Sequence, residues 1–268
     1  MIMKLKDYFT AGNIVCGGIS TFLVIEGLRQ GSDISSVNAK TTMLYFNWAA
    51  YFIMFGWVFD VLDGVVARLT KQFNKFGAEF DNIADLVNYS IAPSALIYGW
   101  YSFLNPTLQG KIIGAVLALM PPVFGSIRIA RFNIKRIEYP GIWFGLPRPA
   151  SAFLLVNLFG LGIFTKMPEI GYFVIPLVSF MNLAVFPFVG HHKRAVPKSW
   201  IFVLILVTII IFGSWLLSLF TDINYFFEVT FTFFAAYFLT YPILVPKEEK
   251  KKIQEFLANW KKEEQELL

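Results

Sequence analysis

The sequence has little charge, one cysteine and two histidines. Asp, Glu, Lys and Arg make up 15% of its 268 residues, well below the content of a soluble domain of this length. The single cysteine, Cys16, excludes an intrachain disulfide and says nothing about the redox compartment. Both histidines stand in "HHKR", which we interpret as a solvated loop and not as a metal site. These shortages exclude an ordinary soluble domain and a disulfide-stabilised fold.

Hydrophobic residues are correspondingly abundant. They form 56% of the chain, 30 residues are Phe, and the mean hydropathy is +0.59. Several apolar runs are long enough to cross a bilayer. We therefore predict an all-α, polytopic membrane protein with about eight transmembrane helices. The expected spans are Thr10–Leu28, Thr41–Leu69, Phe76–Phe103, Gly110–Asn133, Pro149–Phe164, Ile170–Pro187, Trp200–Phe220 and Tyr225–Leu244.

The distribution of lysine and arginine predicts the orientation. Most of the 23 basic residues fall on one side if the spans alternate, and that side is expected to be the cytoplasm. Both termini are then cytoplasmic. The amino-terminal stretch lacks the features of a cleavable signal peptide. Residues 246–268 form a charged tail with helical spacing, and we expect either a helix on the membrane surface or a solvated end.

One polar stretch interrupts the apolar pattern: "DVLDGVVARLTKQFNKFGAEFDNIAD". Its first two aspartates end the second expected span and its last two begin the third, so a helical hairpin would hold both pairs at similar depth. Helical periodicity places two sets of residues on facing sides. One set is Asp60, Asp63, Gly64, Ala67 and Arg68, and the other is Gly77, Asp81 and Asp85. The glycines and the alanine leave room for close helix packing or for a bulky ligand.

Four carboxylates gathered near a membrane interface need compensating charge. Divalent cations supply it, and aspartate oxygens suit Mg²⁺ or Mn²⁺, with Ca²⁺ as an alternative. Two such ions could clamp a phosphate or a diphosphate. The cluster contains neither Cys nor His, which argues against zinc. Two alternatives remain at this point: acids that pair with bases to hold the hairpin, and a proton or cation pathway.

The spacing of this stretch resembles a family signature. It reads D-x2-D-G-x2-A-R-x8-G-x3-D-x3-D, from Asp60 to Asp85, and resembles the motif of the CDP-alcohol phosphotransferases at every fixed position. That resemblance implies a reaction in which a CDP-linked lipid donates its phosphoryl group to a hydroxyl and CMP leaves. It covers 26 residues, and the predicted all-helical membrane context fits it as well. We expect residues 1–245 to form an integral membrane catalytic domain.

The resemblance also implies roles for individual residues. Asp60, Asp63 and Asp81 would hold divalent metal, with two ions expected, and Asp85 would act as general base and as a possible ligand. A carboxylate in hydrogen-bond reach can take the proton of an alcohol, which is a poor nucleophile at neutral pH. The residues Gly64, Ala67, Arg68 and Gly77 would line the nucleotide diphosphate.

The first apolar segment opens with "YFTAGNIVCGG", which resembles the entry of the family's first helix. Thr10 and Asn13 are therefore candidates for contacts with the nucleotide. The alternative for Thr10 is an ordinary helix cap.

Two further stretches bear on the acceptor. "SIRIARFN" and "FGLPRPASA" resemble segments of the membrane-embedded phosphatidylserine synthases within that family. Arg128 and Arg131, three residues apart, could bind one anion together, and Asn133 offers both donors and acceptors. Arg148 would be held between two prolines at the mouth of the fifth span. The alternative for these arginines is positive-inside topology or contact with lipid headgroups.

The resulting prediction is a transferase that moves a phosphatidyl group from CDP-diacylglycerol or CDP-archaeol to L-serine. A sibling enzyme that accepts glycerol 3-phosphate or inositol phosphate is the nearest alternative, and a cation-coupled transporter is the alternative from another class. We expect no nucleic-acid partner. A homodimer and an active site that faces the cytoplasm are further expectations, the first from the resemblance alone.

Overall fold

The computed structural model describes residues 3–31, 36–71, 74–134, 139–161, 164, 166–189, 198–221, 224–237, 242–243 and 245–267. Helices dominate these residues, which agrees with the all-α prediction. The longer helices, in chain order, are α1 (Leu5–Gln30), α2 (Ser36–Thr70), α3 (Lys75–Leu86), α4 (Ala92–Leu104), α5 (Leu108–Ile134), α6 (Arg148–Gly160), α8 (Gly171–Met181), α9 (Lys198–Phe220), α10 (Tyr225–Tyr237) and α12 (Lys247–Leu267). The 3-10 helix η2 (Pro168–Ile170) leads into α8, and His191 and His192 lie outside the described residues.

Each expected span coincides with a helical segment, but not every segment has full membrane length. Leu5–Gln30, Ala39–Thr70 and Leu108–Ile134 are long and apolar enough to cross a bilayer, whereas Pro168–Met181 and Ile209–Phe220 are shorter apolar helices. The third expected span consists of α3, a π-helical turn η1 (Val87–Ile91) and α4, which follow one another without a break. The chain is therefore an all-helical membrane protein, and the total of eight spans stays a prediction.

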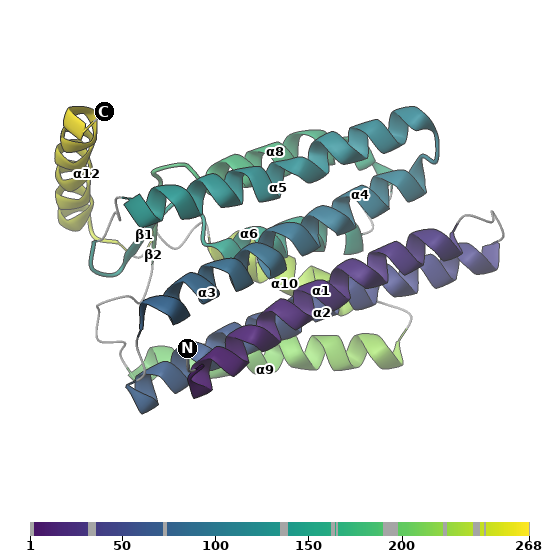
Figure 1. Ribbon diagram of the computed structural model, residues 1–268, viewed down its shortest axis with the longest axis horizontal. Coiled ribbons are helices and arrows are strands. Elements are labelled where there is room, and N and C mark those ends of the chain that lie inside the picture. The colour runs from purple at the N-terminus through teal and green to yellow at the C-terminus, as the bar shows by residue number, and fades with distance from the viewer. Residues whose placement is uncertain are drawn as a thin grey trace.

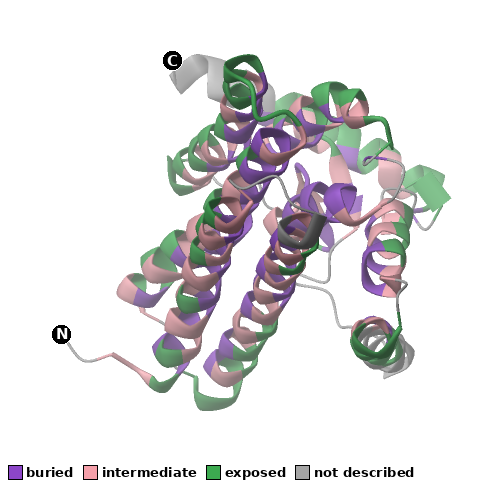
Figure 2. Cartoon of the chain, turned by 90° about the vertical axis from the view of Figure 1, so that its right-hand side faces the viewer, coloured by how far each residue is buried: buried purple, intermediate pink, exposed green. Residues whose placement is uncertain are grey.

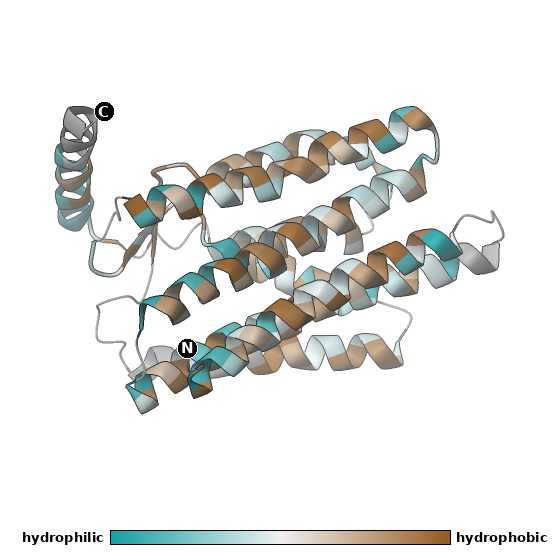
Figure 3. Cartoon of the chain, viewed as in Figure 1, coloured by the Kyte–Doolittle hydropathy of each residue, from teal (hydrophilic) through white to brown (hydrophobic). Residues whose placement is uncertain are grey.

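The long helices lie side by side along one direction (Figure 1). The start of α1, the end of α2, the start of α3, the carboxyl end of α5 and the helix α12 lie at the same end of this bundle. Hydrophilic residues are frequent at that end, and hydrophobic residues are frequent along the helices (Figure 3). Buried residues follow the inward faces while much of the outer surface is exposed, as Figure 2 shows. An apolar outer surface is what a lipid environment requires.

A short antiparallel sheet departs from the all-helical expectation. Strand β1 (Ile142–Phe144) pairs with β2 (Pro187–Val189), with Trp143 opposite Phe188. The sixth expected span reached Pro187, but α8 ends at Met181 because the chain then turns to meet β1 and the loop that follows it. The backbone N–H groups of Gly145 and Leu146 donate to the carbonyls of Phe186 and Met181, each over 2.9 Å.

The carboxyl-terminal tail forms α12, and the prediction of a solvated end is wrong for its apolar face. Ile253 is fully buried against Ile142 and Val245. Trp260 is 6% exposed. Helix α12 runs across the end of the bundle, beside the short sheet (Figure 1). The tail therefore packs on the rest of the protein through one side.

Candidate active site

Three of the four predicted aspartates converge. Asp60 and Asp63 lie one turn apart on α2, and Asp81 lies on α3, so the side chains project from two helices into one space. One carboxylate oxygen from each residue can be chosen so that all three lie within 4.8 Å of one another. Asp63 is buried and the other two are half-buried. Three carboxylates at such distances repel one another unless a cation lies among them.

The predicted close hairpin of α2 and α3 is only partly right. Among the described residues, a Cβ atom placed on Gly64 would meet only the guanidinium of Arg68, at 3.6 and 3.8 Å, so no facing helix packs there. A Cβ on Gly77 would instead overlap the ammonium group of Lys6, which belongs to α1. Helix α1 thus lies against α3 at this point. The space next to Gly64 is left open, as a ligand would need.

The other two residues assigned to the nucleotide differ in exposure. Ala67 is 8% exposed and Arg68 is exposed, one turn beyond Gly64 on α2. The guanidinium of Arg68 therefore lies at the rim of the open space, where a fixed cation can meet phosphate oxygens.

Helix α1 supplies both polar residues that the sequence singled out. The hydroxyl of Thr10 donates to Asp63 Oδ2 over 2.6 Å, and Asn13 Nδ2 donates to Asp85 Oδ1 over 3.4 Å. Thr10 does not cap the helix, because α1 begins at Leu5 with Lys4 as its N-cap. Both side chains are fully buried. The two residues therefore contact the aspartates directly.

Asp85 has different partners from the group of three. Its carboxylate Oδ2 lies 2.8 Å from Nη2 of Arg148, the first residue of α6, and both side chains are largely buried. Arg148 Nη1 donates to Asn82 Oδ1 over 3.4 Å. A buried carboxylate needs this kind of charged partner, because water is excluded from it. The arginine of "GLPRP" thus joins the aspartate motif, although the sequence placed it only near the acceptor.

A π-helical turn follows Asp85 directly and brings in a residue that the sequence analysis missed. In η1, the backbone N–H of Ala92 donates to the carbonyl of Val87, five residues earlier. Pro93, next in the chain, has no N–H to continue the regular α pattern. The buried Tyr89 of this turn donates its hydroxyl to Asp60 Oδ2 over 2.8 Å. Gly77, Asp81, Asp85 and Tyr89 are each four residues apart. Continuing this spacing beyond Asp85 would have pointed to Tyr89.

Asn133 lies near the aspartates but at the surface. It is exposed, its Nδ2 donates to Glu79 over 3.3 Å, and its Oδ1 accepts from Asn82 over 3.4 Å. Since Asn82 also accepts from Arg148, polar contacts run from Asp85 to the end of α5. Sequence reasoning named neither Asn82 nor Glu79.

Arg128 and Arg131 anchor the loop after α8 instead of reaching the aspartates. Arg128 Nη1 donates to the carbonyls of Leu146 and Asn182, over 2.6 and 2.8 Å. Arg131 Nη1 donates to the carbonyl of Leu183 over 2.8 Å. The carbonyls at the end of a helix attract cations. In this structure the two arginines, which we predicted to bind one anion together, stabilise the loop between α8 and β2.

The backbone conformation explains why the first residue of "GLPRP" is a glycine. Gly145 has φ +81°, and a Cβ there would lie 2.6 Å from the carbonyl oxygen of Asn182 and 2.8 Å from Nη1 of Arg128. Only glycine accepts both constraints easily. Pro147 then occupies the N-cap position of α6, directly before Arg148.

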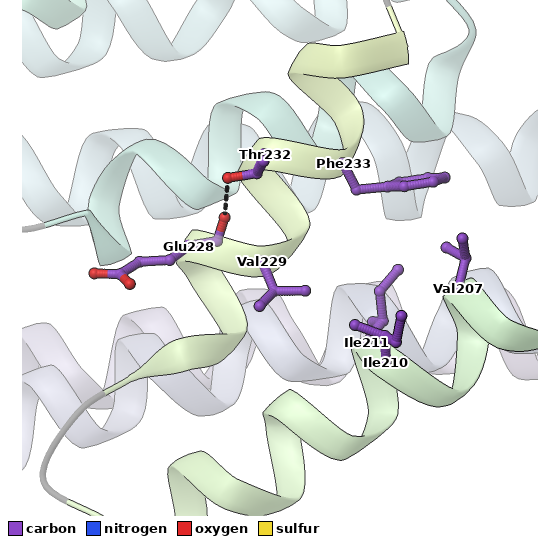
Figure 4. A pocket seen from close by; sticks show the side chains of 7 residues that line it. All are labelled: Val207, Ile210, Ile211, Glu228, Val229, Thr232 and Phe233. Atoms are coloured by element: carbon purple, nitrogen blue, oxygen red, sulfur yellow. Dashed lines mark hydrogen bonds between the residues drawn. The ribbon is translucent and has the colours of Figure 1, made fainter.

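A second, separate pocket lies between α9 and α10. Figure 4 shows Val229 and Phe233 of α10 turned toward Val207 and Ile211 of α9. Its lining is almost entirely apolar, and Glu228 supplies the one carboxylate among the described lining residues. No aspartate of the cluster lines it, so it is not the site of phosphate chemistry.

The donor set of the aspartate cluster fits a hard divalent cation. It offers carboxylate oxygens only, with no sulfur or imidazole among the described residues around it, which suits Mg²⁺, Mn²⁺ or Ca²⁺ and disfavours zinc. The hydrogen bonds to Asp60 and Asp63 restrain two of the three carboxylates, as outer partners of metal ligands do.

Fold and site together define a membrane-embedded, predominantly helical protein with an acidic centre near one end of its bundle. Residues 3–240 match the CDP-alcohol phosphatidyltransferase family, and the chain belongs to that family. The resemblance to the CDP-alcohol phosphotransferases, which the sequence predicted, is thereby confirmed.

Three curated relatives to which the chain is similar carry the name CDP-diacylglycerol–serine O-phosphatidyltransferase. The Helicobacter pylori (strain J99) protein is 43% identical over 153 residues, which cover 56% of this chain and 54% of that protein. The Methanocaldococcus jannaschii protein is 37% identical over 58% of this chain and 60% of that protein, and the Bacillus subtilis protein 34% over 48% and 70%. The match thus spans about half the length of the Helicobacter relative.

Proposed function

We propose that this protein transfers a phosphatidyl group from CDP-diacylglycerol, or the corresponding group from CDP-archaeol, to the hydroxyl of L-serine. The products are phosphatidylserine, or its ether analogue, and CMP. The observation that carries the proposal is the arrangement of Asp60, Asp63 and Asp81 within 4.8 Å, with Asp85 held beside them by Arg148. The serine specificity draws on the names of the relatives.

Within this proposal, the three converging aspartates hold Mg²⁺ or Mn²⁺, with two ions expected and Asp85 as a further candidate ligand. When bound, the metal would stabilise the negative charge on the diphosphate and on the departing CMP. The chain itself contributes the restraint on the carboxylates. Thr10 and Tyr89 each donate to one of them, so their orientation is fixed before a substrate arrives.

Asp85 is the proposed general base. Its carboxylate accepts a hydrogen bond from Asn13 and pairs with Arg148, so it is held in place on two sides. The base takes the proton of the serine hydroxyl as the new oxygen–phosphorus bond forms and the bond to the CMP oxygen breaks. A positioned carboxylate contributes about 10²- to 10⁴-fold to such a step.

The diphosphate of the donor is proposed to lie in the open space beside Gly64, between Ala67, Arg68 and Gly77. Arg148 reaches Asp85 from the acceptor side, while Arg128, Arg131 and Asn133 border that side. Guanidinium groups can bind the serine carboxylate through paired N–H donors. The lipid chains would remain in the bilayer, and the site would face the cytoplasm.

The decisive experiment measures CMP release from CDP-diacylglycerol by the full chain in detergent or nanodiscs with Mg²⁺ or Mn²⁺. Serine, glycerol 3-phosphate and inositol phosphate are supplied singly. We expect CMP release only with serine, and phosphatidylserine as the lipid product. Release with glycerol 3-phosphate alone would refute the acceptor assignment, and no release with any acceptor would refute the transferase proposal. Light scattering of the purified protein would test the expected homodimer.

A further inference from the structure

Helix α12 lies beyond residues 3–240, which match the family. It is nevertheless attached to the bundle. Ile253, Phe256, Leu257 and Trp260 follow helical spacing and occupy one side, on which Ile253 and Trp260 are buried. Polar residues away from that side, such as Gln254 and Lys251, are exposed. Helix α12 is therefore amphipathic and packs on the rest of the protein through its apolar side.

The apolar side of α12 contacts β1, which precedes the "GLPRP" segment of the proposed acceptor side. The ring of Phe256 lies 5.4 Å from that of Tyr139 and stacks on Phe144 at 6.1 Å, between ring centroids. Phe144 ends β1, one residue before Gly145 with its positive φ and four before Arg148. Helix α12 thus supports the strand from which the "GLPRP" segment starts.

A second contact reaches a proposed substrate residue. The guanidinium carbon of Arg131 lies 5.4 Å above the ring centroid of Trp260. A ring over the face of a guanidinium leaves its N–H groups directed outward in the plane. One of these donates to the carbonyl of Leu183. A stacking contact on the face and a hydrogen bond at the edge together fix both the tilt and the direction of this side chain.

The two contacts converge on one pocket. It is lined by Arg128, Arg131, Phe132, Trp143, Phe144, Asn182 and Leu183. Helix α12 touches two of these walls, since Trp260 contacts Arg131 and Phe256 contacts Phe144. The pocket is small and combines two arginines with three aromatic residues. Guanidinium groups can bind a carboxylate.

We propose that α12 is a positioning helix for the acceptor site, and that Trp260 orients Arg131 toward the carboxylate of serine. The proposal rests on the function proposed above and adds to it a role for a segment outside the family match. Trp260 acts through Arg131 and is a positioning residue. Its removal should therefore affect the use of serine and leave the use of the CDP-lipid unchanged.

The test compares the full chain with Trp260→Leu, Trp260→Phe and the matched control Gln254→Ala, which changes the exposed side of the same helix. Initial rates of CMP release are measured against serine at saturating CDP-diacylglycerol and against CDP-diacylglycerol at saturating serine. For Trp260→Leu we expect KM for serine to rise by about 3- to 10-fold. The kcat and the KM for the lipid should stay within about twofold of wild type. Trp260→Phe retains an aromatic face and should recover part of the loss, and Gln254→Ala should match the wild type.

Hydrogen exchange on the same proteins provides a readout that does not require activity. Faster exchange of the backbone amides of residues 142–146 in Trp260→Leu is expected, because α12 then supports β1 less firmly. An unchanged KM for serine in an active Trp260→Leu protein would overturn the proposal. Unchanged exchange would overturn it even if the wild type used no serine. A wild type that is inactive with serine, but in which exchange responds to Trp260→Leu, would refute the acceptor assignment and keep the positioning role of α12.

Discussion

Arg148 Nη2 and Asp85 Oδ2 lie 2.8 Å apart and join the first residue of α6 to the last aspartate of the motif in α3. The two residues belong to different sequence signatures, and only the fold brings them into contact. Because both side chains are largely buried, loss of either partner leaves an uncompensated charge. The pair connects the metal side of the proposed site with its acceptor side.

Replacing Asp85 by Asn should lower kcat by about 100-fold or more, because the amide cannot accept the serine proton. The side chain keeps its size and an oxygen for Arg148, so the affinity for CDP-diacylglycerol should change little. CMP release measures the effect on kcat, and equilibrium binding of CDP-diacylglycerol measures the effect on donor affinity. Glu26→Gln, a change at an acid near the carboxyl end of α1, is the control. Turnover at the wild-type rate in Asp85→Asn would remove this residue from the role of base.

Removal of metal should abolish CMP release, and added Mg²⁺ or Mn²⁺ should restore it. In Asp63→Asn the same ions should raise the melting temperature far less than in the wild type, because one of three converging carboxylates is lost. Thermal shift against metal concentration measures this effect without any turnover. A wild type that releases CMP at full rate in excess chelator would contradict the assignment of the cluster as a metal site.

Tyr89→Phe should weaken metal binding by about 10-fold while the fold stays intact. The substitution removes only the hydroxyl that donates to Asp60 over 2.8 Å, and the loss of such an outer partner typically costs about 10- to 100-fold in metal affinity or activity. Titration of the melting temperature with Mn²⁺ gives the apparent affinity. Tyr98→Phe, on the more exposed part of α4, is the matched control. Equal metal affinities for Tyr89→Phe and the control would show that the hydroxyl does not orient Asp60.

Gly77→Ala tests the contact between α3 and α1. The added methyl group would occupy the place of the Lys6 ammonium and crowd Asn74 Oδ1, which accepts from the N–H of residue 77. Alanine favours a helix by about 1 kcal/mol over glycine, so the stability loss should be small. Lys6 must move, and because it is buried next to the candidate diphosphate space, the KM for CDP-diacylglycerol should rise. Ala78→Ser, an exposed change in the same turn, should leave this KM unaltered; a rise of equal size there would point to a general effect on α3.

The sequence predicted the features that depend on neighbours along the chain. Hydrophobic run length located the helical segments, and the spacing of Asp60, Asp63, Gly64 and Ala67 placed them on one face of α2. The same periodicity placed Asp81 and Asp85 on α3. These properties follow from the 3.6-residue turn and from the solubility of side chains in lipid. The family resemblance, which the match over residues 3–240 confirms, also came from local spacing.

Only the tertiary structure decided which of these faces meet. Asn13 and Asp85 are 72 residues apart, Arg148 and Asp85 are 63 apart, and α12 reaches Arg131 across the whole second half of the chain. The π-helical turn that presents Tyr89, the short sheet and the burial of Ile253 likewise depend on packing against distant segments. Local periodicity fixes the direction of a side chain around its own helix axis. It does not fix how two helices are rotated and shifted against each other, because that depends on side-chain packing summed over the whole interface.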